Sequence, residues 1–365
     1  MFTAIDLFCG AGGFSIGLKK CGFNVATAID CWEPAVRTYQ RNFTHSCLLT
    51  DVREIAAQTL LAHLAGNECD LVVGGPPCQG FSVQRVGAND DERNDLVYEF
   101  ARVVSTIRPR MFLMENVPGL LGARGRPHVA RFRELLIKSG YVVEAQLVNA
   151  AEYGVPQVRR RVFFYGWLRE RVDHFLFPAS QSTPENFRTV SDAIGDLPSP
   201  PSDYSCHPQD PLHRRMRMSK LNAERLLHVP PGGGMAQLPT SLRVNAHKNG
   251  ADRIGHRYVY GRLSPDKPAS TITARFDSFT RGKFAHPSEH RNITLREGAR
   301  LQTFPDDFIF EGTQEQIAAL IGNAVPPLLA ERICCAVARH LAGETQPFGT
   351  LGLSFSVSKE KEQIA

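Results

Sequence analysis

The feature that most constrains the fold is the alternation of short apolar runs with amphipathic segments through the first half of the chain. Runs that are apolar throughout are typical of strands in a parallel sheet covered on both faces. Strands that alternate with helices form βαβ units, so the pattern predicts an open, doubly wound, mostly parallel α/β sheet. Strands are expected at 3–8, 24–29, 70–73, 111–114, 141–147 and 162–167. Helices are expected at 13–20, 34–42, 52–65, 95–107 and 129–139.

The character of the sequence changes after residue 196. Clusters of proline, glycine and serine at 197–202 and 230–234 interrupt regular structure. Weak periodicity predicts a smaller, loop-rich second domain, and helical patterns return at 294–301 and 327–341. The expected division is a first domain (1–197), a second domain (198–290), a closing segment (291–342) and a polar tail (343–365).

Positive charge is concentrated in one part of the chain. Residues 211–300 hold 17 lysines and arginines against 6 acidic residues, whereas the rest of the chain holds 25 against 31. The formal net charge of the whole chain is +5. A basic segment attached to a slightly acidic body is expected of a phosphate-binding module. The alternative is a solvated loop region whose charges have no specific partner.

The sequence carries no sign of a membrane or of secretion. No apolar run has the length needed to span a bilayer, and no basic N-terminal segment precedes a long apolar stretch. The cytoplasm is therefore the expected location. The nine cysteines include no C-x-x-C pair, and their odd number and spacing argue against a disulfide framework and a zinc site. Most of them are expected to be small buried apolar residues.

The first expected strand runs directly into a glycine-rich turn, DLFCGAGGF at 6–14, which a helix follows. Glycines permit a sharp turn and the close approach of a ligand, and the helix N-terminus favours negative charge. Asp30 ends the second strand, where an acidic side chain can bind ribose hydroxyls. Asp51 follows the third strand region, where it can accept the amine of an adenine. A turn without ligand and aspartates that cap helices are the alternatives; together the three features favour an adenosyl cofactor.

Two further strand ends carry residues suited to covalent chemistry. The segment GGPPCQGFS at 74–82 presents the thiol of Cys78 at the carboxyl end of a strand, between prolines and glycines. A thiol acts as a nucleophile when its pKa is lowered or a proton acceptor is coupled to it. Glu115 ends the next strand, where a carboxyl group can donate a proton to a substrate ring nitrogen. A buried structural cysteine and a capping or solvent-facing glutamate are the alternatives.

Three consecutive arginines lie at the start of the last expected strand, in QVRRRVF at 157–163. In an extended strand Arg159 and Arg161 point to one face and Arg160 points to the other. Two guanidinium groups on one face can hold a base carbonyl and a phosphate. The alternative is a basic surface strand.

Six segments occur in a characteristic order: DLFCGAGGFS, GGPPCQGFS, ENVPGLL, QVRRRVFF, TLREGARLQTFPDDF and GNAVPP. In this order they resemble the cytosine-5 DNA methyltransferases, over residues 3 to about 342. The Pro-Pro-Cys and Glu-Asn-Val segments carry most of the specificity of the resemblance, and the glycine turn carries little. The resemblance implies a Rossmann-like methyltransferase sheet with a smaller, loop-rich target-recognition domain at 198–290.

The resemblance also implies a mechanism. Cys78 would add to carbon 6 of a cytosine, which makes carbon 5 nucleophilic toward the methyl group of S-adenosylmethionine. Glu115 would engage ring nitrogen 3 and the exocyclic amine, while Arg161, with Arg159, would hold the carbonyl oxygen or a flanking phosphate. Loss of the carbon 5 proton and elimination of Cys78 would release the product. The target base must be flipped out of the duplex for this attack, and residues 83–93 are expected to close over it.

The implied cofactor is S-adenosylmethionine, which becomes S-adenosylhomocysteine, without a metal. Asp30 is expected on its ribose and Asp51 near its adenine, and the last helix is expected to return to the first domain. Position 31 departs from the family, because Cys31 stands where many relatives place a bulky residue against the adenine, although Trp32 is adjacent. The other cofactor-binding residues expected are Asp6, Phe8, Gly10, Gly12, Gly13, Val52, Pro76, Asn323 and Val325.

Double-stranded DNA is the implied partner, and no membrane is involved. The basic part of 198–290 would read the base sequence. The expected location is the cytoplasm or nucleoid of a bacterium or archaeon. A restriction endonuclease that acts on the same sequence, without direct contact, is a further expected partner.

Three other functions are compatible with parts of the sequence. A transfer RNA cytosine methyltransferase would keep the fold, but its Cys-Phe-Thr tripeptide is absent and the basic segment here is long. A catalytically silent DNA-binding relative is disfavoured, because every catalytic position holds the expected residue. A Rossmann-type oxidoreductase rests on the glycine turn and Asp30 alone, and leaves the Pro-Pro-Cys and GNAVPP segments unexplained.

Overall fold

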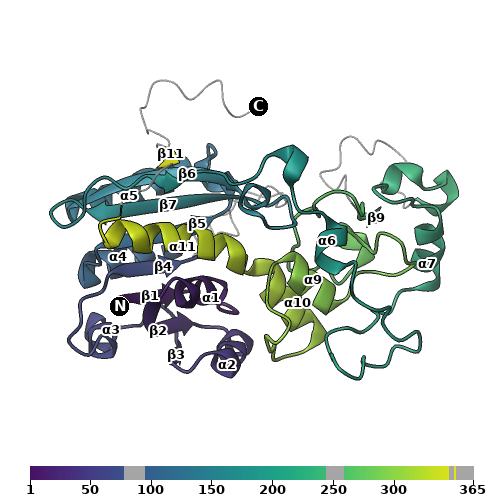
Figure 1. The fold of residues 1–365 in the computed structure, drawn as a ribbon, viewed down its shortest axis with the longest axis horizontal. Helices are drawn as coiled ribbons and strands as arrows, with labels where there is room; N and C mark the ends of the chain where they lie inside the picture. The colour runs from purple at the N-terminus through teal and green to yellow at the C-terminus, as the bar shows by residue number, and fades with distance from the viewer. Residues whose placement is uncertain (78–94, 244–258, 345–348, 351–365) are drawn as a thin grey trace.

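A seven-stranded sheet forms the centre of the larger part of the molecule (Figure 1). The computed structural model describes residues 1–77, 95–243, 259–344 and 349–350. The strands lie in the order β3-β2-β1-β4-β5-β7-β6, so the chain winds outward from β1 in both directions. The strands are β1 (Phe2–Leu7), β2 (Phe23–Asp30), β3 (Ser46–Leu49), β4 (Leu71–Gly74), β5 (Met111–Asn116), β6 (Tyr141–Asn149) and β7 (Arg160–Leu168).

The sheet is mostly parallel, as predicted. All neighbouring pairs from β3 to β5 are parallel, whereas β7 runs antiparallel to both of its neighbours, β5 and β6. The register pairs Glu115 with Phe163 and Asn116 with Val162. The start of β7 therefore lies beside the end of β5.

Helices cover both faces of the sheet. Neighbouring residues of β5 enter opposite cores, Leu113 on one face and Phe112 and Met114 on the other. One face packs against α3 (Ala57–His63), α4 (Leu96–Ile107) and α5 (Arg126–Lys138), and the other packs against α1 (Gly13–Lys20) and α11 (Pro327–Leu341). Helix α2 (Glu33–Asn42) contacts β2 and β3. The last helix thus returns to the first strands, as expected from the resemblance.

The second part of the molecule is loop-rich, also as predicted. Among the described residues of 198–290, the regular elements are α7 (Lys220–Leu227) and a small sheet of β9 (Gly261–Arg262) and β10 (Lys283–Ala285), with short 3-10 turns. Helices α6 (Val190–Ile194), α9 (Leu295–Leu301) and α10 (Gln314–Asn323) share a hydrophobic core with this segment. Two further short strands, β8 (Phe177–Pro178) and β11 (Gly349–Thr350), pair with each other.

Among the described residues four helices differ from the sequence expectation: α3 is shorter than expected, and α6, α7 and α10 lie outside the expected helices. The third helix is shorter than 52–65, because the chain first turns around Asp51, whose carboxylate accepts the backbone N–H of Arg53 at 2.9 Å. Helix α10 lies outside the expected helices, although its N-terminal capping box of Thr313 and Gln316 is visible in the sequence. Short helices with a partial apolar face give weak periodicity, so capping residues are the better signal here.

The stretch Gln314–Leu341 is long and apolar enough, by composition, to cross a membrane, which corrects the expectation that no such run exists. Its most apolar window has a mean hydropathy of 1.3 and is 72% buried inside the protein. The stretch is also broken between α10 and α11. These observations identify it as a core element of this fold.

A disulfide joins Cys21, at the end of α1, to Cys335 of α11. The argument against disulfides from the cysteine pattern is therefore wrong for this pair. The two residues are 314 positions apart, and they meet because α1 and α11 pack side by side. Cys9, Cys47, Cys69 and Cys334 are buried, as expected, whereas Cys31 and Cys206 are exposed.

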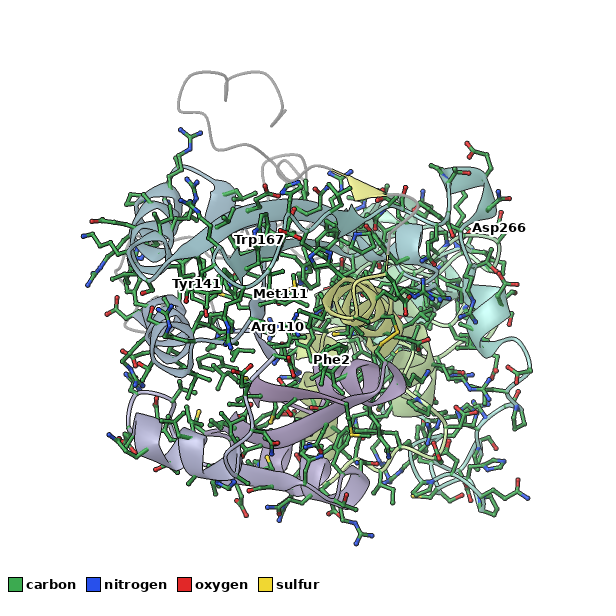
Figure 2. All side chains as sticks on the ribbon, turned by 60° about the vertical axis from the view of Figure 1, so that its left-hand side comes forward. Phe2, Arg110, Met111, Tyr141, Trp167 and Asp266 are labelled. Atoms are coloured by element: carbon green, nitrogen blue, oxygen red, sulfur yellow. A yellow bond between two sulfur atoms is a disulfide. The ribbon has the colours of Figure 1, made fainter. Side chains whose placement is uncertain are left out.

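The edge of the sheet at which β1 and β5 begin is closed by its own side chains (Figure 2). The guanidinium of Arg110 lies 6.0 Å from the centre of the Phe2 ring, and the Tyr141 hydroxyl donates to the Pro109 carbonyl at 2.6 Å. Met111, at the start of β5, pairs with Trp167, near the end of β7. We call this the amino edge; the loops that carry the predicted site residues leave the opposite, carboxyl edge.

Candidate active site at the carboxyl edge of the sheet

The carboxyl ends of β1 and β4 meet where the strand order reverses. In open α/β sheets, ligands bind in the crevice outside this point. The chain leaves β1 into the glycine turn and leaves β4 into Pro76 and Pro77, and β5 ends beside them. The predicted cofactor turn and the predicted catalytic segment therefore share one edge.

Glu115 and Arg161 form an ion pair at this edge. The Arg161 Nε lies 2.7 Å from the Glu115 Oε1, and the two side chains are only 15% and 12% exposed. The reversed direction of β7 makes this contact possible, because it places the start of β7 beside the end of β5. The pair holds the carboxylate in one orientation, with its Oε2 facing Gly75, where an added Cβ would lie 3.5 Å away. A fixed carboxyl group next to the Pro-Pro segment suits hydrogen bonding to a planar ring.

Asn116 ties the end of β5 to the segment after β4. Its Nδ2 donates to the Pro76 carbonyl at 3.2 Å, and its Oδ1 accepts the N–H of Val117 at 2.8 Å. Pro76 is buried, which fixes the backbone that leads toward Cys78. Cys78 itself lies outside the described residues, as does the expected closing segment 83–93.

Arg159 occupies a different environment from Arg161. It is 1% exposed, and its guanidinium donates to the carbonyls of Ile272 (2.9 Å), Gly322 (3.0 Å) and Ala324 (3.1 Å). Burial, followed by the nearby charge of Arg161, lowers its pKa. Arg159 therefore joins the start of β7 to the second part of the molecule and to the end of α10.

The glycine turn has the shape of a ligand cradle. Gly10 has a φ of +54°, and a Cβ added there would meet no atom within 4 Å. The other two glycines are needed for packing: a Cβ on Gly12 would lie 2.5 Å from the Phe43 ring, and one on Gly13 would lie 2.1 Å from the Val325 carbonyl oxygen. Phe8 has a φ of +55°, a conformation uncommon outside glycine, at the point where β1 turns into the cradle. Open space at Gly10 agrees with the expectation that a ligand lies there.

Asp30 is held at the cradle by backbone groups. Its Oδ2 accepts the N–H of Gly10 at 2.9 Å, and its Oδ1 accepts the N–H of Trp32 at 2.8 Å. Burial raises the pKa of this carboxyl group, and the backbone hydrogen bonds oppose that shift. A carboxylate fixed in this way keeps lone pairs for the hydroxyl groups of a ribose, so the donor set fits the expected cofactor.

The neighbouring residues of the expected adenine site are arranged less simply. The Asp51 carboxylate is paired with Arg53, at 2.7 Å between Oδ2 and Nη2, and this hydrogen bond lowers the pKa of Asp51. Cys31 is an exposed residue, but its thiol is partly desolvated. This desolvation, and to a smaller extent the charges of Asp30 and Asp51, raise the pKa of the thiol. Val52 is buried in the core of the sheet. Asp30, Cys31 and Asp51 thus lie close together, and their contact with an adenine stays a prediction.

Three other predicted cofactor residues differ in exposure. Asp6 is fully buried, with its Oδ2 accepting the hydroxyl of Ser15 at 2.6 Å, so it supports the turn from within. Val325 is buried and its carbonyl abuts Gly13. Asn323, at the end of α10, is exposed. Among the described residues, no group of histidine, cysteine and acidic side chains is arranged to hold a metal ion; the absence of a metal stays a prediction.

The positive charge of the second part is only partly at its surface. Four arginines are buried among the described residues of 211–300: Arg225, Arg262, Arg291 and Arg296. Arg291 pairs with Glu297 at 2.7 Å and Arg296 with Asp210 at 2.5 Å. The basic side chains exposed among the described residues of this range and without an ion pair there are Arg214, Arg217, Lys220, Lys267 and Arg281. The number of lysines and arginines in residues 211–300 therefore overstates the positive charge that is exposed to bind phosphates.

Two supporting glutamines were absent from the predicted site. Gln157 is fully buried, donates to the Gln302 Oε1 at 2.8 Å and accepts the N–H of Ile272 at 2.8 Å. Gln302 donates in turn to the Ile321 carbonyl at 2.6 Å. Gln157 lies in QVRRRVFF and Gln302 in TLREGARLQTF, so both stand inside the recognised segments. Their roles need the tertiary structure, since a lone glutamine has no spacing signal.

Comparison with known proteins agrees with this geometry. Residues 2–339 match the family model described as C-5 cytosine-specific DNA methylase. The chain is 37% identical to the type II methyltransferase M1.HphI of Haemophilus parahaemolyticus over 346 residues, which cover 94% of this chain and 88% of the relative. It is 35% identical to the type II methylase M.HgiDII of Herpetosiphon aurantiacus, covering 93% and 96%.

Solved structures of similar fold include a protein described as a prophage-encoded DNA modification methyltransferase of E. coli. The two chains superimpose with a TM-score of 0.72 at 28% identity, over 94% of this chain and 100% of the other. A DNMT2 variant from Spodoptera frugiperda gives a TM-score of 0.63 at 15% identity, over 92% and 99% of the two chains, a likeness of fold alone.

Proposed function

This chain belongs to the C-5 cytosine-specific DNA methylase family and is a DNA cytosine-5 methyltransferase, and on that premise we propose that it works through a covalent adduct of Cys78 with a flipped-out cytosine. The observation that supports this most directly is the Glu115–Arg161 pair, 2.7 Å apart, beside the Pro76 segment that leads to Cys78. It places an oriented carboxyl group next to the expected nucleophile. The relatives are type II methyltransferases of restriction-modification systems.

The family uses S-adenosylmethionine, which supplies an electrophilic methyl group when bound. We propose that the open space at Gly10 receives it and that Asp30 holds its ribose. Trp32 and the exposed Cys31 would border the adenine. The Asp51 carboxylate, which is paired with Arg53, would accept a hydrogen bond from the adenine amine while it keeps this ion pair. Asn323 completes the proposed pocket from the end of α10.

In the proposed mechanism, the Cys78 thiolate forms a bond to carbon 6 of cytosine, and the ring electrons make carbon 5 nucleophilic. Glu115 holds a proton at ring nitrogen 3 and accepts a hydrogen bond from the exocyclic amine N–H. The proton at ring nitrogen 3 neutralises the charge that develops during addition. Arg161 orients Glu115 and reaches the base carbonyl or a flanking phosphate. After methylation, a base removes the carbon 5 proton, the bond to Cys78 breaks and the thiolate leaves. Arg159 has a positioning role in this proposal, because its donors are bound to three carbonyls.

The proposed substrate is a specific sequence of double-stranded DNA, read by the second domain (198–290). The target base must leave the helix stack, because carbon 6 cannot be reached inside a duplex. We further propose that the enzyme acts in the cytoplasm or nucleoid and that an endonuclease of the same specificity accompanies it.

Replacement of Cys78 by serine tests the covalent mechanism. Cys78→Ser is expected to lower methyl transfer below detection while affinity for DNA and cofactor changes little, since a hydroxyl is a far weaker nucleophile. Wild-type protein is expected to form a denaturation-resistant adduct with DNA that carries 5-fluorocytosine, because fluorine blocks the final proton loss. Methyl transfer is read by bisulfite sequencing, which also identifies the methylated sequence.

Cys206→Ser is the matched control, because Cys206 is an exposed cysteine of the second part. It should retain both activity and the fluorocytosine adduct. Substantial methylation by Cys78→Ser, or an adduct that still forms in that variant, would overturn the role of Cys78.

A further inference from the structure

A strongly basic stretch follows the active-site strand in the α/β part of the molecule. Residues 117–133 contain four arginines and one histidine and no acidic residue. Arg124, Arg126 and Arg131 are exposed. This charge lies outside the basic segment 211–300, and the proposed mechanism does not use it.

The stretch begins at the edge that carries the active site. Glu115 is the second-last residue of β5, and the short helix η3 (Pro118–Leu121) follows after Val117 and contacts both β7 and α5. Leu120 of η3 is fully buried in the core of the sheet. Helix α5 then packs on the sheet and ends three residues before Tyr141, at the amino edge. Arg124 and Arg126 therefore lie near the carboxyl edge of the sheet, as Glu115 does.

The turn that carries these arginines is rigid. A Cβ added at Gly125 would lie 1.9 Å from the Leu120 carbonyl oxygen, so only glycine permits this packing. The N–H groups of Gly125 and Arg126 donate to the Gly122 carbonyl at 2.9 and 3.0 Å. Arg124 and Arg126 flank Gly125 and are thus presented from a fixed backbone. A fixed backbone reduces the conformational entropy lost when a ligand binds.

The start of α5 adds to the positive potential. The helix has 13 residues, its N-cap is Gly125 without a side-chain cap, and its first turn contains no acidic residue. Backbone N–H groups at a helix N-terminus attract anions, and no carboxylate in the first turn of this helix compensates for them.

Among the residues that the structure describes, Arg124 and Arg131 also form no ion pair, whereas other exposed arginines do. In the same part of the molecule, Arg108 pairs with Glu170 at 2.9 Å and Arg171 with Glu68 at 2.5 Å. Arg124 has no ion-pair or hydrogen-bond partner among the described residues. Arg131 is instead oriented by an aromatic ring, with its guanidinium carbon 4.3 Å from the centre of the Tyr98 ring.

We propose that Arg124, Arg126 and Arg131 form a second phosphate-binding surface, on which the DNA backbone rests at the α/β side of the active site. The described part of the second domain (198–290) lies at the other side of the molecule, beyond α11 (Figure 1). Of the arginines in the described part of 211–300, four are buried, so these residues supply less surface charge than their composition indicates. Contacts from both sides hold the duplex while a base is out of the stack.

The test compares DNA binding as a function of salt concentration. The double variant Arg124→Gln/Arg131→Gln is measured on a duplex that the wild-type enzyme methylates and on an unrelated duplex of equal length. Each lost phosphate contact reduces the slope of log Kd against log salt by about 1, so a decrease of about 2 is expected. When the salt concentration rises fourfold, the factor by which binding weakens should then be about 16 times smaller for the variant than for the wild type. Affinity should fall by the same factor for both duplexes, because phosphates carry no sequence information.

Arg169→Gln/Arg339→Gln is the matched control, since both arginines are exposed and lie near the amino edge, where β7 and α11 end. It should leave the slope unchanged, and Arg124→Lys/Arg131→Lys should restore it. An unchanged slope in the Gln double variant would overturn the proposal. So would a loss confined to the methylated duplex, which would mean that these side chains read bases. Binding is measured without turnover, so the result is independent of the role of Cys78.

Discussion

At the scale of single residues, Asp6 links the glycine turn to a buried polar chain. Its Oδ2 accepts the Ser15 hydroxyl at 2.6 Å, that hydroxyl contacts the hydroxyl of Tyr39, and Tyr39 contacts His45 Nε2 at 2.5 Å. The Asp6 Oδ1 is buried and has no partner among the described residues. Burial raises the pKa of Asp6 to about 7; the Ser15 hydrogen bond opposes this shift and the charge of Asp30 adds to it. The glycine turn thus rests on a carboxyl group that burial keeps largely neutral below pH 7.

Replacement of Asp6 by asparagine is expected to change how stability depends on pH. The stabilisation from a raised pKa is complete below the unfolded value of 3.8 and is lost as the pH rises toward about 7. Asp6→Asn carries no ionisable group there, so its Tm relative to wild type should rise over this window and stay level above it. Thermal unfolding followed at successive pH values measures the difference. The exposed control Asp173→Asn should give a curve parallel to wild type.

A constant offset between Asp6→Asn and wild type at every pH would show that Asp6 does not titrate in this window. The isosteric amide keeps an oxygen for the Ser15 hydroxyl. A change in overall stability is therefore separable from the change in pH dependence.

At the scale of elements, two arrangements create the site. The reversal of β7 brings Arg161 to Glu115. The close packing of α1 on α11 brings the late GNAVPP segment to the cradle, and it depends on two glycines. An added Cβ at Gly13 would lie 2.1 Å from the Val325 carbonyl oxygen, and one at Gly17 would lie 2.6 Å from the backbone of Ala330. Both contacts involve backbone, which cannot move aside as a side chain can.

Gly17→Ala is expected to destabilise the protein although alanine is the better helix former. Overpacking of a well-packed contact costs about 1–3 kcal/mol, whereas the helix-propensity gain is about 1 kcal/mol. Chemical denaturation should therefore show a lower midpoint for Gly17→Ala. Lys19→Ala, at an exposed position of the same helix, should stay within about 0.5 kcal/mol of wild type. A Gly17→Ala protein as stable as Lys19→Ala would contradict the tight packing of α1 on α11.

At the scale of the whole molecule, charge is divided between structural and surface roles. Arg262 donates to the carbonyls of Val229 (2.7 Å), His286 (2.8 Å) and Glu289 (2.7 Å) and binds no carboxylate among the described residues. Arg262 thereby joins segments of a small hydrophobic core that includes Leu226 and Val229. Arg217, Lys220 and Arg281 are exposed in the same part of the molecule and are available to DNA.

Neutralising surface and internal cations should therefore have opposite signatures. The triple variant Arg217→Gln/Lys220→Gln/Arg281→Gln is expected to reduce the salt slope of DNA binding, by about 1 for each side chain that touches a phosphate, at an unchanged Tm. Arg262→Gln is expected to leave buried carbonyls without donors and to cost more than about 2 kcal/mol of stability. Fluorescence anisotropy over a salt series and thermal unfolding separate the two. Salt-insensitive DNA binding by the wild type would contradict any phosphate role for the segment 198–290.

Much of the fold follows from local patterns. The runs 3–8 and 111–114 were expected as strands and correspond to β1 (Phe2–Leu7) and β5 (Met111–Asn116), because their apolar side chains are buried on both faces. The first helix was expected at 13–20 and is found there. Helix α10 escaped prediction because its burial comes from distant partners, and the direction of β7 is not encoded in its own periodicity.

By itself, the sequence determined the family, the sheet and the kinds of residue that meet at its carboxyl edge, because motifs and periodicity are local properties of the chain. Only the tertiary structure decided which residues of the same type have different roles. Asp30 faces the cradle while Asp6 lies beneath it, and Arg161 meets Glu115 while Arg159 is turned to carbonyls. The physical reason is burial, since the partner that a charge finds on leaving water comes from a segment far away in the chain.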